Sequence, residues 1–406
     1  MTSGIRFFLL VTIIALGGCA KTVEIAPALH GPFRCENANV ALDTDFAAGN
    51  IESCQAVEDS GLAIAIAPED APPINCSAWY AFRLTPRKAG RQTVDLQYQH
   101  CGHRYWPKIS SDGENWTRVP DDAVEIGEVD GVRQARIILD LGKEPVFVAG
   151  QEIISTADYT RWIDELSQSP LVDARLLGQS AEGRDIPALT IAAPKSTARE
   201  KIVLIGRQHP PEVTGALVMM PFVETLLAGD PLAQRFRARF TTIVVPVLNP
   251  DGVDRGYWRH NIGSTDLNRD WGPFAQPETR LMDNLLSGIA AAPDEQLRLF
   301  VDFHSTQYDI FYTIPDDFPT SPPLFLKKWL DRLQQRMPDY PVNRDANHNL
   351  LQDNSKNYVH KTYGVPTMTF EVGDETDRQF IIKLAREAAR TMMETLLATE
   401  ENAEAE

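Results

Sequence analysis

Ile202-Val-Leu-Ile205 is followed directly by Gly206-Arg-Gln-His-Pro-Pro-Glu212. The first four residues form a short apolar run that is typical of a buried strand. Comparable apolar runs recur three times, at 242–247, 299–303 and 366–370. Helical patterns separate or follow them, at 214–227, 277–290, 324–336 and 377–397. Strands that alternate with helices predict an α/β domain over residues 151–398, with a mixed, mostly parallel sheet flanked by helices.

The segment before this domain has a different pattern. Residues 33–150 contain short alternating or β-branched runs, among them 79–84, 93–98 and 135–141, and a plausible hairpin turn at 111–114. Short strands at this spacing predict an all-β sandwich domain ahead of the α/β domain. The chain ends in Glu400-Glu-Asn-Ala-Glu-Ala-Glu406, so residues 399–406 are expected to form an acidic tail.

The first residues indicate export and lipid attachment. Arg6 precedes an apolar run, Phe7 to Leu16, that is too short to span a bilayer comfortably. The run ends in Leu16-Gly-Gly-Cys19, which resembles a bacterial lipobox. We therefore expect a lipoprotein signal peptide over 1–18, a lipid on Cys19 and a tether over 19–32. This predicts a periplasm-facing protein of the bacterial cell envelope, anchored to the membrane only by its lipid; an ordinary secretory signal is the alternative.

Composition excludes several classes of protein. The 406 residues are 43% hydrophobic and 23% charged, which is ordinary for folded proteins and argues against extensive disorder. Lys and Arg number 39 against 56 Asp and Glu, a formal net charge of -17. Because so acidic a surface repels phosphate backbones, no nucleic-acid partner is expected.

Four cysteines other than Cys19 all lie in the first quarter of the chain: Cys35, Cys54, Cys76 and Cys101. Four cysteines in an exported segment suggest two disulfides, and three connectivities are possible. A zinc site that includes His100 and His103 is the alternative, although the spacing lacks a paired C-x-x-C.

The chemistry-bearing residues follow predicted strands. His209 and Glu212 come after the strand at 202–205, and His304 comes directly after the strand at 299–303. Open α/β sheets place their sites at such strand ends. Two histidines and a glutamate are a known ligand set for catalytic zinc, which leaves a fourth position for water. The H-x-x-E spacing alone is a weak signal.

Further motifs strengthen the prediction, and they occur in a fixed order: Asn249-Pro-Asp-Gly252, Tyr257-Trp-Arg259, Asp266-Leu-Asn-Arg-Asp-Trp271, Asp302-Phe-His-Ser305 and Thr369-Phe-Glu-Val-Gly-Asp374. In this order the series resembles the zinc carboxypeptidases of the carboxypeptidase A type. It is most similar to the cytosolic carboxypeptidase branch, which also carries a β-sandwich ahead of the catalytic domain. The resemblance covers roughly residues 75 to 390.

The resemblance implies a metal centre and an activity. One Zn²⁺ per chain is expected as the cofactor, held by His209, Glu212 and His304. Glu371 corresponds to the general base and acid, which takes a proton from a zinc-activated water and later gives one to the leaving amine. Arg259 corresponds to the arginine that stabilises the oxyanion. The expected function is hydrolysis of the C-terminal peptide bond of peptides in the cell envelope.

The resemblance also implies how substrate is held. Asn268 and Arg269 correspond to the pair that binds the free C-terminal carboxylate of a peptide substrate. Asp266 corresponds to a carboxylate that orients the first zinc histidine.

Two positions depart from the family pattern. Pro211 stands where digestive members have an arginine that contacts substrate further from the cut. Counting back from Glu371 to the usual substrate-covering tyrosine gives Asn349, and although Tyr358 lies closer to the base, that role is left unassigned. The same counting places Lys356 at the position that helps to set the side-chain pocket, which would favour an acidic C-terminal residue.

Other functions stay open. Murein stem peptides are a second possible substrate class, and a zinc-dependent deacylase or amidase would share the metal ligands. A non-catalytic binding lipoprotein would not need an intact base. A serine hydrolase is disfavoured, because Gly178-Gln-Ser-Ala-Glu-Gly183 misses the G-x-S-x-G elbow.

Overall fold

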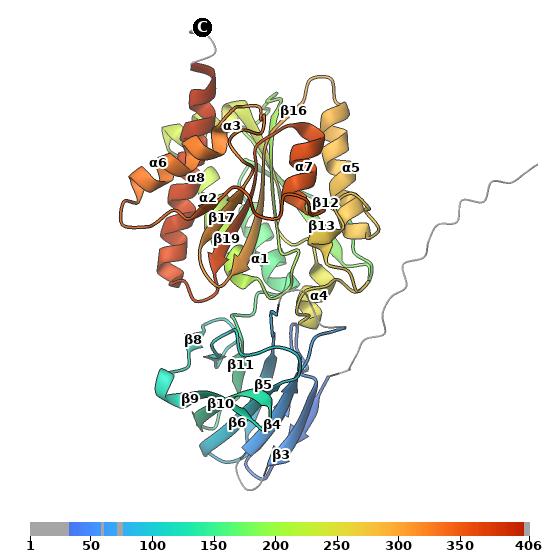
Figure 1. Cartoon of the computed structure of the whole chain (residues 1–406), viewed down its shortest axis with the longest axis vertical. Coiled ribbons are helices and arrows are strands. Elements are labelled where there is room, and N and C mark those ends of the chain that lie inside the picture. The colour runs from blue at the N-terminus through green and yellow to red at the C-terminus, as the bar shows by residue number, and fades with distance from the viewer. Residues whose placement is uncertain (1–31, 58–60, 71–75, 402–406) are drawn as a thin grey trace, which may run out of the picture.

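The computed structural model describes residues 32–57, 61–70 and 76–401. The predicted signal peptide, Cys19, nearly all of the tether and the last five residues of the predicted tail lie outside this range. The described chain forms two bodies, a β-rich one and an α/β one, which lie end to end (Figure 1). The predicted fold class, an α/β domain preceded by a β-sandwich, is confirmed.

The β-rich body consists of two sheets. One has the strand order β1 (Arg34–Glu36), β2 (Val40–Asp43), β5 (Ala81–Pro86), β11 (Val146–Ala149), β7 (Lys108–Ser110) and β8 (Thr117–Arg118). The other has the order β3 (Ser53–Val57), β4 (Gly61–Ile66), β6 (Gly90–Tyr98), β10 (Val132–Leu141) and β9 (Val124–Val129). Alternate residues of β6 and β10 are buried in a shared apolar core, as expected for sheets that pack face to face. The predicted hairpin around 111–114 is confirmed by the pairing of β7 with β8.

The four cysteines form two disulfides within this body. Cys35 pairs with Cys54 and Cys76 pairs with Cys101, which answers the connectivity that the sequence left open. The alternative zinc site is wrong, because all four sulfur atoms are used in these bonds. His103 instead makes a 3.0 Å hydrogen bond through Nδ1 to the hydroxyl of Tyr98.

The α/β body is built on an eight-stranded mixed sheet. Its order is β12 (Val172–Gln179), β13 (Asp185–Ile191), β15 (Phe240–Val245), β14 (Glu200–Gly206), β16 (Gln296–Thr306), β19 (Thr367–Gly373), β17 (Ile310–Thr313) and β18 (Arg344–Asp345). The four central strands run parallel, and they are the four apolar runs of the sequence. The outer strands were not predicted; β17 and β18 are short, and most residues of β12 are exposed.

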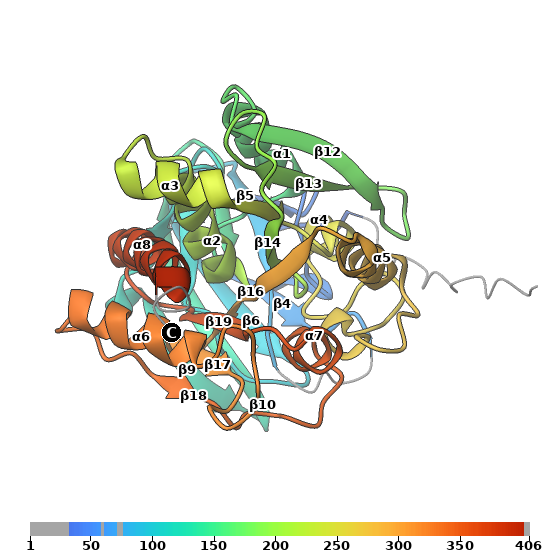
Figure 2. The ribbon, with the colours of Figure 1, turned by 90° about the horizontal axis from the view of Figure 1, so that it is seen from above.

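Helices cover both faces of this sheet (Figure 2). One face carries α2 (Val213–Leu226), α3 (Pro231–Arg239), α6 (Phe325–Arg336) and α8 (Arg378–Glu401), with α1 (Thr156–Leu166) packed on the same core. The other face carries α5 (Pro277–Ala291) and α7 (Ser355–Tyr363). The expected helices at 214–227, 277–290, 324–336 and 377–397 are confirmed, and α8 continues to Glu401 because alanine and glutamate favour helix.

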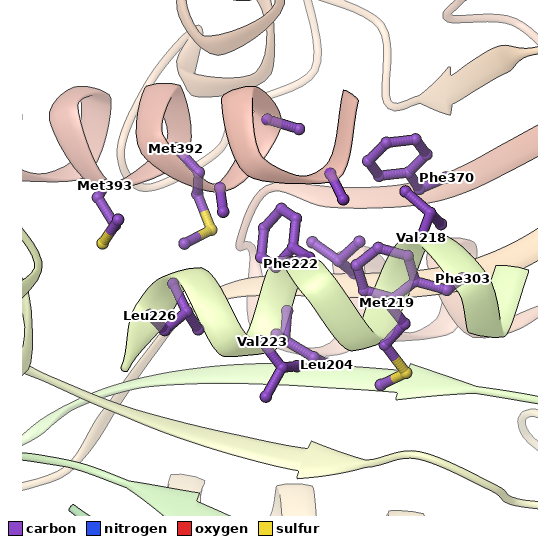
Figure 3. Packing of buried hydrophobic residues seen from close by; sticks show 14 of the residues in the cluster. Leu204, Val218, Met219, Phe222, Val223, Leu226, Phe303, Phe370, Met392 and Met393 are labelled. Carbon is purple, nitrogen blue, oxygen red and sulfur yellow. The ribbon is translucent and has the colours of Figure 1, made fainter. Parts of the chain in front are cut away.

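Helix α2 is the central helix of the first face. Phe222 lies between the sheet and α8, with its ring 5.4 Å from that of Phe303 (Figure 3). Within the described residues no single helix is long and apolar enough to cross a membrane; α2 and α3 pass such a test only together, across a 91° bend. The buried side chains of both helices belong to this core.

The carboxyl ends of the central strands face the β-sandwich. Just past β19, Asp374 pairs with Arg104 of the β-sandwich at 2.8 Å. The same guanidinium lies 3.5 Å from the carbonyl of Ser305, near the end of β16. The short helix α4 (Pro250–Arg255), which follows β15, also lies at the junction of the two bodies (Figure 1). The carboxyl ends of these strands, which carry the candidate site, therefore border the other domain.

Candidate active site

Three side chains converge at this edge. His209 and Glu212 lie in the loop between β14 and α2, and His304 lies in β16. All three are buried, and each offers a ligand atom within 4.8 Å of the other two. Nδ1 of His209 lies 2.7 Å from one carboxylate oxygen of Glu212, and Nδ1 of His304 lies 2.6 Å from the other. Among the described residues this is the one group with the composition and spacing to hold a metal ion.

Each imidazole is fixed by a further carboxylate. Nε2 of His209 lies 2.9 Å from Asp266, and Nε2 of His304 lies 2.9 Å from Asp302. Each ring therefore directs Nδ1 toward Glu212 and donates its Nε2 hydrogen to the carboxylate on its other side. Catalytic zinc sites show this arrangement, in which outer carboxylates set the tautomer and orientation of the ligands. The donor set of two imidazoles and one carboxylate fits Zn²⁺.

Asp266 connects this centre to Arg259. Its second oxygen accepts a 2.7 Å hydrogen bond from Nε of Arg259, and both side chains are buried. Although burial acts in the opposite direction, the interaction with His209 and the charge of Arg259 hold the pKa of Asp266 well below its usual range. Asp266 is thus ionised when it accepts both hydrogen bonds, and it orients a ligand and a cation together.

Glu371 lies beside the three converging side chains. It is in β19, directly opposite His304 of β16 in the parallel register, so both side chains lie on one face of the sheet. Its Oε2 is buried and has no hydrogen-bond partner among the described residues. Burial, and then the negative charge of Glu212, raise the pKa of Glu371. A carboxylate with a free oxygen at this position can accept a proton from a molecule bound in the site.

Asn268 and Arg269 lie in the 3-10 turn η3 (Leu267–Arg269), which begins after Asp266. The Asn268 amide oxygen accepts from the backbone N–H of Ser355 at 2.9 Å, and Nδ2 lies 3.5 Å from His304. Arg269 donates to the carbonyl of Asn268 at 2.7 Å. Among the described residues no carboxylate pairs with Arg269, so its partly buried guanidinium is available to an anion.

Sequence reasoning missed Asp302 as a site residue. The signal was present, because residues two apart in a strand share a face, and Asp302 precedes His304 by two. Asp302 also accepts a 2.6 Å hydrogen bond from Gln208 and another from the hydroxyl of Ser355. Asp302 therefore connects the loop after β14, strand β16 and helix α7 next to the metal-facing His304.

Tyr358, to which the sequence assigned no role, lies away from the metal-facing residues. Its hydroxyl donates to Asp283 at 2.9 Å, and its ring packs against Trp271 and Phe274, so it belongs to the core under α5 and α7. Tyr312 of β17 instead pairs with Thr369, diagonal to Glu371 on the same sheet face. Its ring stacks on that of His348 with centroids 4.0 Å apart.

Lys356 lies in the first turn of α7, next to the residue that holds Asn268. Its ammonium is buried and donates to the amide oxygen of Asn357 at 2.9 Å. Among the described residues no carboxylate forms an ion pair with it, and burial lowers its pKa to about 8. Pro211 is buried in the loop that carries Glu212 and has no polar side chain to offer a substrate.

The fold and the site together define a class of protein, namely metallohydrolases with three protein ligands at the carboxyl edge of an α/β sheet. Comparison with known families makes this assignment specific. A family model described as Zinc carboxypeptidase matches residues 159–397, more than half of the chain. A second model, Cytosolic carboxypeptidase N-terminal domain, matches residues 42–131. The chain belongs to the zinc carboxypeptidase family, whose cofactor is Zn²⁺.

Curated relatives match over shorter stretches. Cytosolic carboxypeptidase 6 of Caenorhabditis elegans is 33% identical over 152 residues, which are 36% of this chain and 33% of the relative. The Homo sapiens protein of the same name is 32% identical over 136 residues, or 32% of this chain and 27% of the relative. The chain thus spans about a third or less of the length of these relatives.

Solved structures match over nearly the whole chain. A metallo-carboxypeptidase from Burkholderia cenocepacia has a TM-score of 0.73 and 20% identity, with 88% of this chain and 99% of that chain covered. A metallo-carboxypeptidase from Pseudomonas aeruginosa, in complex with (2-guanidinoethylmercapto)succinic acid, has a TM-score of 0.70 and 22% identity, with 88% and 99% covered. At this identity the likeness establishes the fold, which includes both domains.

Proposed function

We propose that this protein is a zinc-dependent metallocarboxypeptidase that removes the C-terminal residue of peptides in the bacterial cell envelope. The observation that carries the proposal is the convergence of His209, Glu212 and His304 beside Glu371, whose Oε2 has no hydrogen-bond partner in the part of the chain that the structure describes. Membership of the zinc carboxypeptidase family supports it.

His209, Glu212 and His304 would hold the metal. When bound, Zn²⁺ supplies Lewis-acid polarisation of a carbonyl oxygen and lowers the pKa of water. Glu371 then acts on protons: its Oε2 accepts one from the attacking water as the carbon–oxygen bond forms. It delivers that proton to the leaving nitrogen as the carbon–nitrogen bond breaks. The products are a free amino acid and a peptide one residue shorter.

Two arginines have different tasks in this proposal. Arg259 is held by Asp266 through Nε alone, so its remaining nitrogens can donate to the carbonyl oxygen as negative charge develops there. Arg269, together with Asn268, binds the terminal carboxylate, for which a guanidinium provides paired donors. Binding this carboxylate restricts cleavage to the last peptide bond.

Lys356 supports a preference for an acidic C-terminal residue. It is a buried ammonium that forms no ion pair with a carboxylate of the described residues, and its neighbour Ser355 holds Asn268 through a backbone hydrogen bond. An acidic substrate side chain near the carboxylate-binding pair would supply the missing counter-charge, and a buried charge gains most from such a partner.

Three features support export to the cell envelope. The first residues have the pattern of a lipoprotein signal that ends before Cys19. The β-sandwich contains two disulfides, which persist in oxidising compartments. Envelope peptides, including murein stem peptides, are therefore the substrates to test first.

The test uses the chain from Ala20 onward, loaded with zinc. It is incubated with peptides that differ only in the last residue and with a murein tripeptide, and product masses are followed. Glu371→Gln and a chelated sample are the controls. We expect loss of a single C-terminal residue, fastest for Glu or Asp, which both controls abolish. Tight binding of one zinc without cleavage of any peptide would overturn the proposal and favour a deacylase or a binding protein.

A further inference from the structure

Glu69 of the β-sandwich holds the backbone of the segment that carries Arg259. Its Oε2 accepts from the backbone N–H of Trp258 at 2.7 Å. Its Oε1 accepts from the N–H of Arg259 at 3.0 Å and from that of His260 at 2.7 Å. Among the described residues no cationic side chain pairs with Glu69, so three consecutive backbone amides are its partners. A carboxylate bound by backbone amides makes strong, charge-assisted hydrogen bonds.

The residue that follows Glu69 in the β-sandwich also holds this segment. Asp70 accepts a hydrogen bond from Nδ1 of His260, with distances of 2.9 and 2.7 Å to its two oxygens. On the other side, the carbonyl of His260 accepts from the Asn249 amide of the α/β domain at 3.0 Å. The segment is therefore fixed from both domains.

Residues just before Arg259 also contact the β-sandwich. Trp258 is fully buried and belongs to the apolar core of that domain. The carbonyl of Gly256 accepts from the Asn50 amide at 2.8 Å. Gly256 has φ = 65°, and a Cβ at this position would lie 2.5 Å from the carbonyl oxygen of Ala48, so only glycine fits this approach.

These contacts lead to the metal centre in three steps. Glu69 holds the Arg259 backbone, the Arg259 side chain donates to Asp266 at 2.7 Å, and Asp266 lies 2.9 Å from His209. The β-sandwich holds the backbone of Arg259, and Asp266 of the α/β domain holds its guanidinium. The position of this guanidinium therefore depends on both domains.

We propose that the β-sandwich is part of the catalytic apparatus, and that Glu69 is the positioning residue through which it places Arg259. The proposal rests on the proposed function, since it assigns Arg259 to the reaction. Glu69 touches neither substrate nor metal and acts only through Arg259. An error of about 1 Å in such a donor costs roughly 100-fold in rate, so the contact has a measurable consequence.

The test compares Glu69→Gln and the milder Glu69→Asp with the wild-type, zinc-loaded chain. Glutamine offers one acceptor oxygen and places an NH₂ group against a backbone N–H. We expect hydrogen exchange at the amides of Trp258, Arg259 and His260 to accelerate about tenfold or more. We expect kcat to fall about tenfold or more, KM to change less than about threefold, and one zinc per chain to be retained.

The matched control is Glu152→Gln. Glu152 lies between the two domains and makes a 2.7 Å ion pair with Arg378, but it makes no contact with the 258–260 segment. Its loss should leave amide exchange at 258–260 and kcat unchanged. This control separates a general weakening of the domain junction from an effect on Arg259.

A double-mutant cycle separates positioning from a merely structural role. If Glu69 acts through Arg259, Glu69→Gln in an Arg259→Ala background changes kcat/KM by less than about twofold. Multiplication of the two single effects, or unchanged exchange at 258–260, would overturn the inference. If the wild-type chain cleaves no peptide, the proposed function fails on its own, and the exchange measurement still decides whether Glu69 holds the segment.

Discussion

Asp302 lies 2.9 Å from Nε2 of His304, two residues earlier on the same face of β16. It is fully buried, and it also binds Gln208 and Ser355, so its position is determined by three separate segments. A carboxylate fixed in this way holds the His304 ring with Nδ1 toward Glu212. The structure thus assigns to each metal-facing histidine its own orienting carboxylate.

Asp302→Asn should weaken zinc binding. An amide cannot supply the negative charge that raises the basicity of the ligand, and loss of such a partner typically costs about 10–100-fold in metal affinity. Competition with a chelating dye measures the change. The control is Asp283→Asn. It removes a carboxylate that accepts a hydrogen bond from the Tyr358 hydroxyl, in the core under α5 and α7. Equal affinity of wild type and Asp302→Asn would contradict the assignment.

Removal of the metal should destabilise the fold. A ligand that binds only the native state stabilises it by about 4 kcal/mol at 1,000 times its Kd. We therefore expect Tm to fall on chelation and to recover when zinc is added back. In His304→Ala the same addition should give a much smaller rise. A wild-type Tm that does not respond to zinc would show that the three side chains do not hold it.

The position of Lys356 predicts that the preference for an acidic C-terminal residue depends on pH. Burial lowers its pKa to about 8, so its ammonium is charged below that pH and neutral above it. We expect the ratio of kcat/KM for a peptide ending in Glu over one ending in Leu to decline as pH rises past about 8. Lys356→Met should reduce this ratio by about tenfold or more at pH 7.

The control for this experiment is Lys361→Met, because Lys361 is an exposed lysine on the same helix. It should leave the preference unchanged. A preference that does not respond to Lys356→Met would exclude Lys356 from the side-chain pocket while leaving the metal site untouched.

The pairing of His260 with Asp70 predicts that part of the stability of the fold depends on pH. Burial acts to lower its pKa, but the hydrogen bond and charge of Asp70, with Glu69 and Asp266 nearby, raise it above the usual value. A raised histidine pKa gives stability that is fully present below about pH 6.5 and is lost as pH rises through the raised value. The Tm difference between wild type and Asp70→Asn should therefore be largest near pH 6 and shrink toward pH 9.

Asp45→Asn provides a comparison, because Asp45 forms an exposed ion pair with Arg34 and contacts no histidine in the described chain. Its small effect on Tm should not vary between pH 6 and 9. A constant difference between wild type and Asp70→Asn over this range would show that the His260–Asp70 pair does not titrate as expected.

The central part of the fold could be predicted from the sequence because its signals are local. The four parallel strands contain the four apolar runs, and the metal-facing residues come shortly after two of these runs. The spacing of two residues places Asp302 on the same strand face as His304, but an acidic residue within an apolar run does not show which side chain it binds, so its role was missed. Strand β17, which carries Tyr312, is only four residues long, so its apolar pattern was too short to recognise.

Contacts between distant segments could not be predicted. The pairing of Cys35 with Cys54 and of Cys76 with Cys101 depends on how β-strands are ordered in space. Glu69 lies 190 residues before Arg259, and nothing in its own segment marks it as a partner of that loop. Tyr358 shows the opposite case, since it is close to the base in sequence while its side chain is held by Asp283.

The most direct test of the account uses one peptide in two forms, with a free C-terminal carboxylate and with a C-terminal amide. Product masses are measured for the zinc-loaded wild type and for Glu371→Gln. We predict that the wild type shortens the free acid by one residue and leaves the amide intact, and that Glu371→Gln binds zinc but cleaves neither form. Cleavage of the amide at a similar rate, or full activity of Glu371→Gln, would contradict the account.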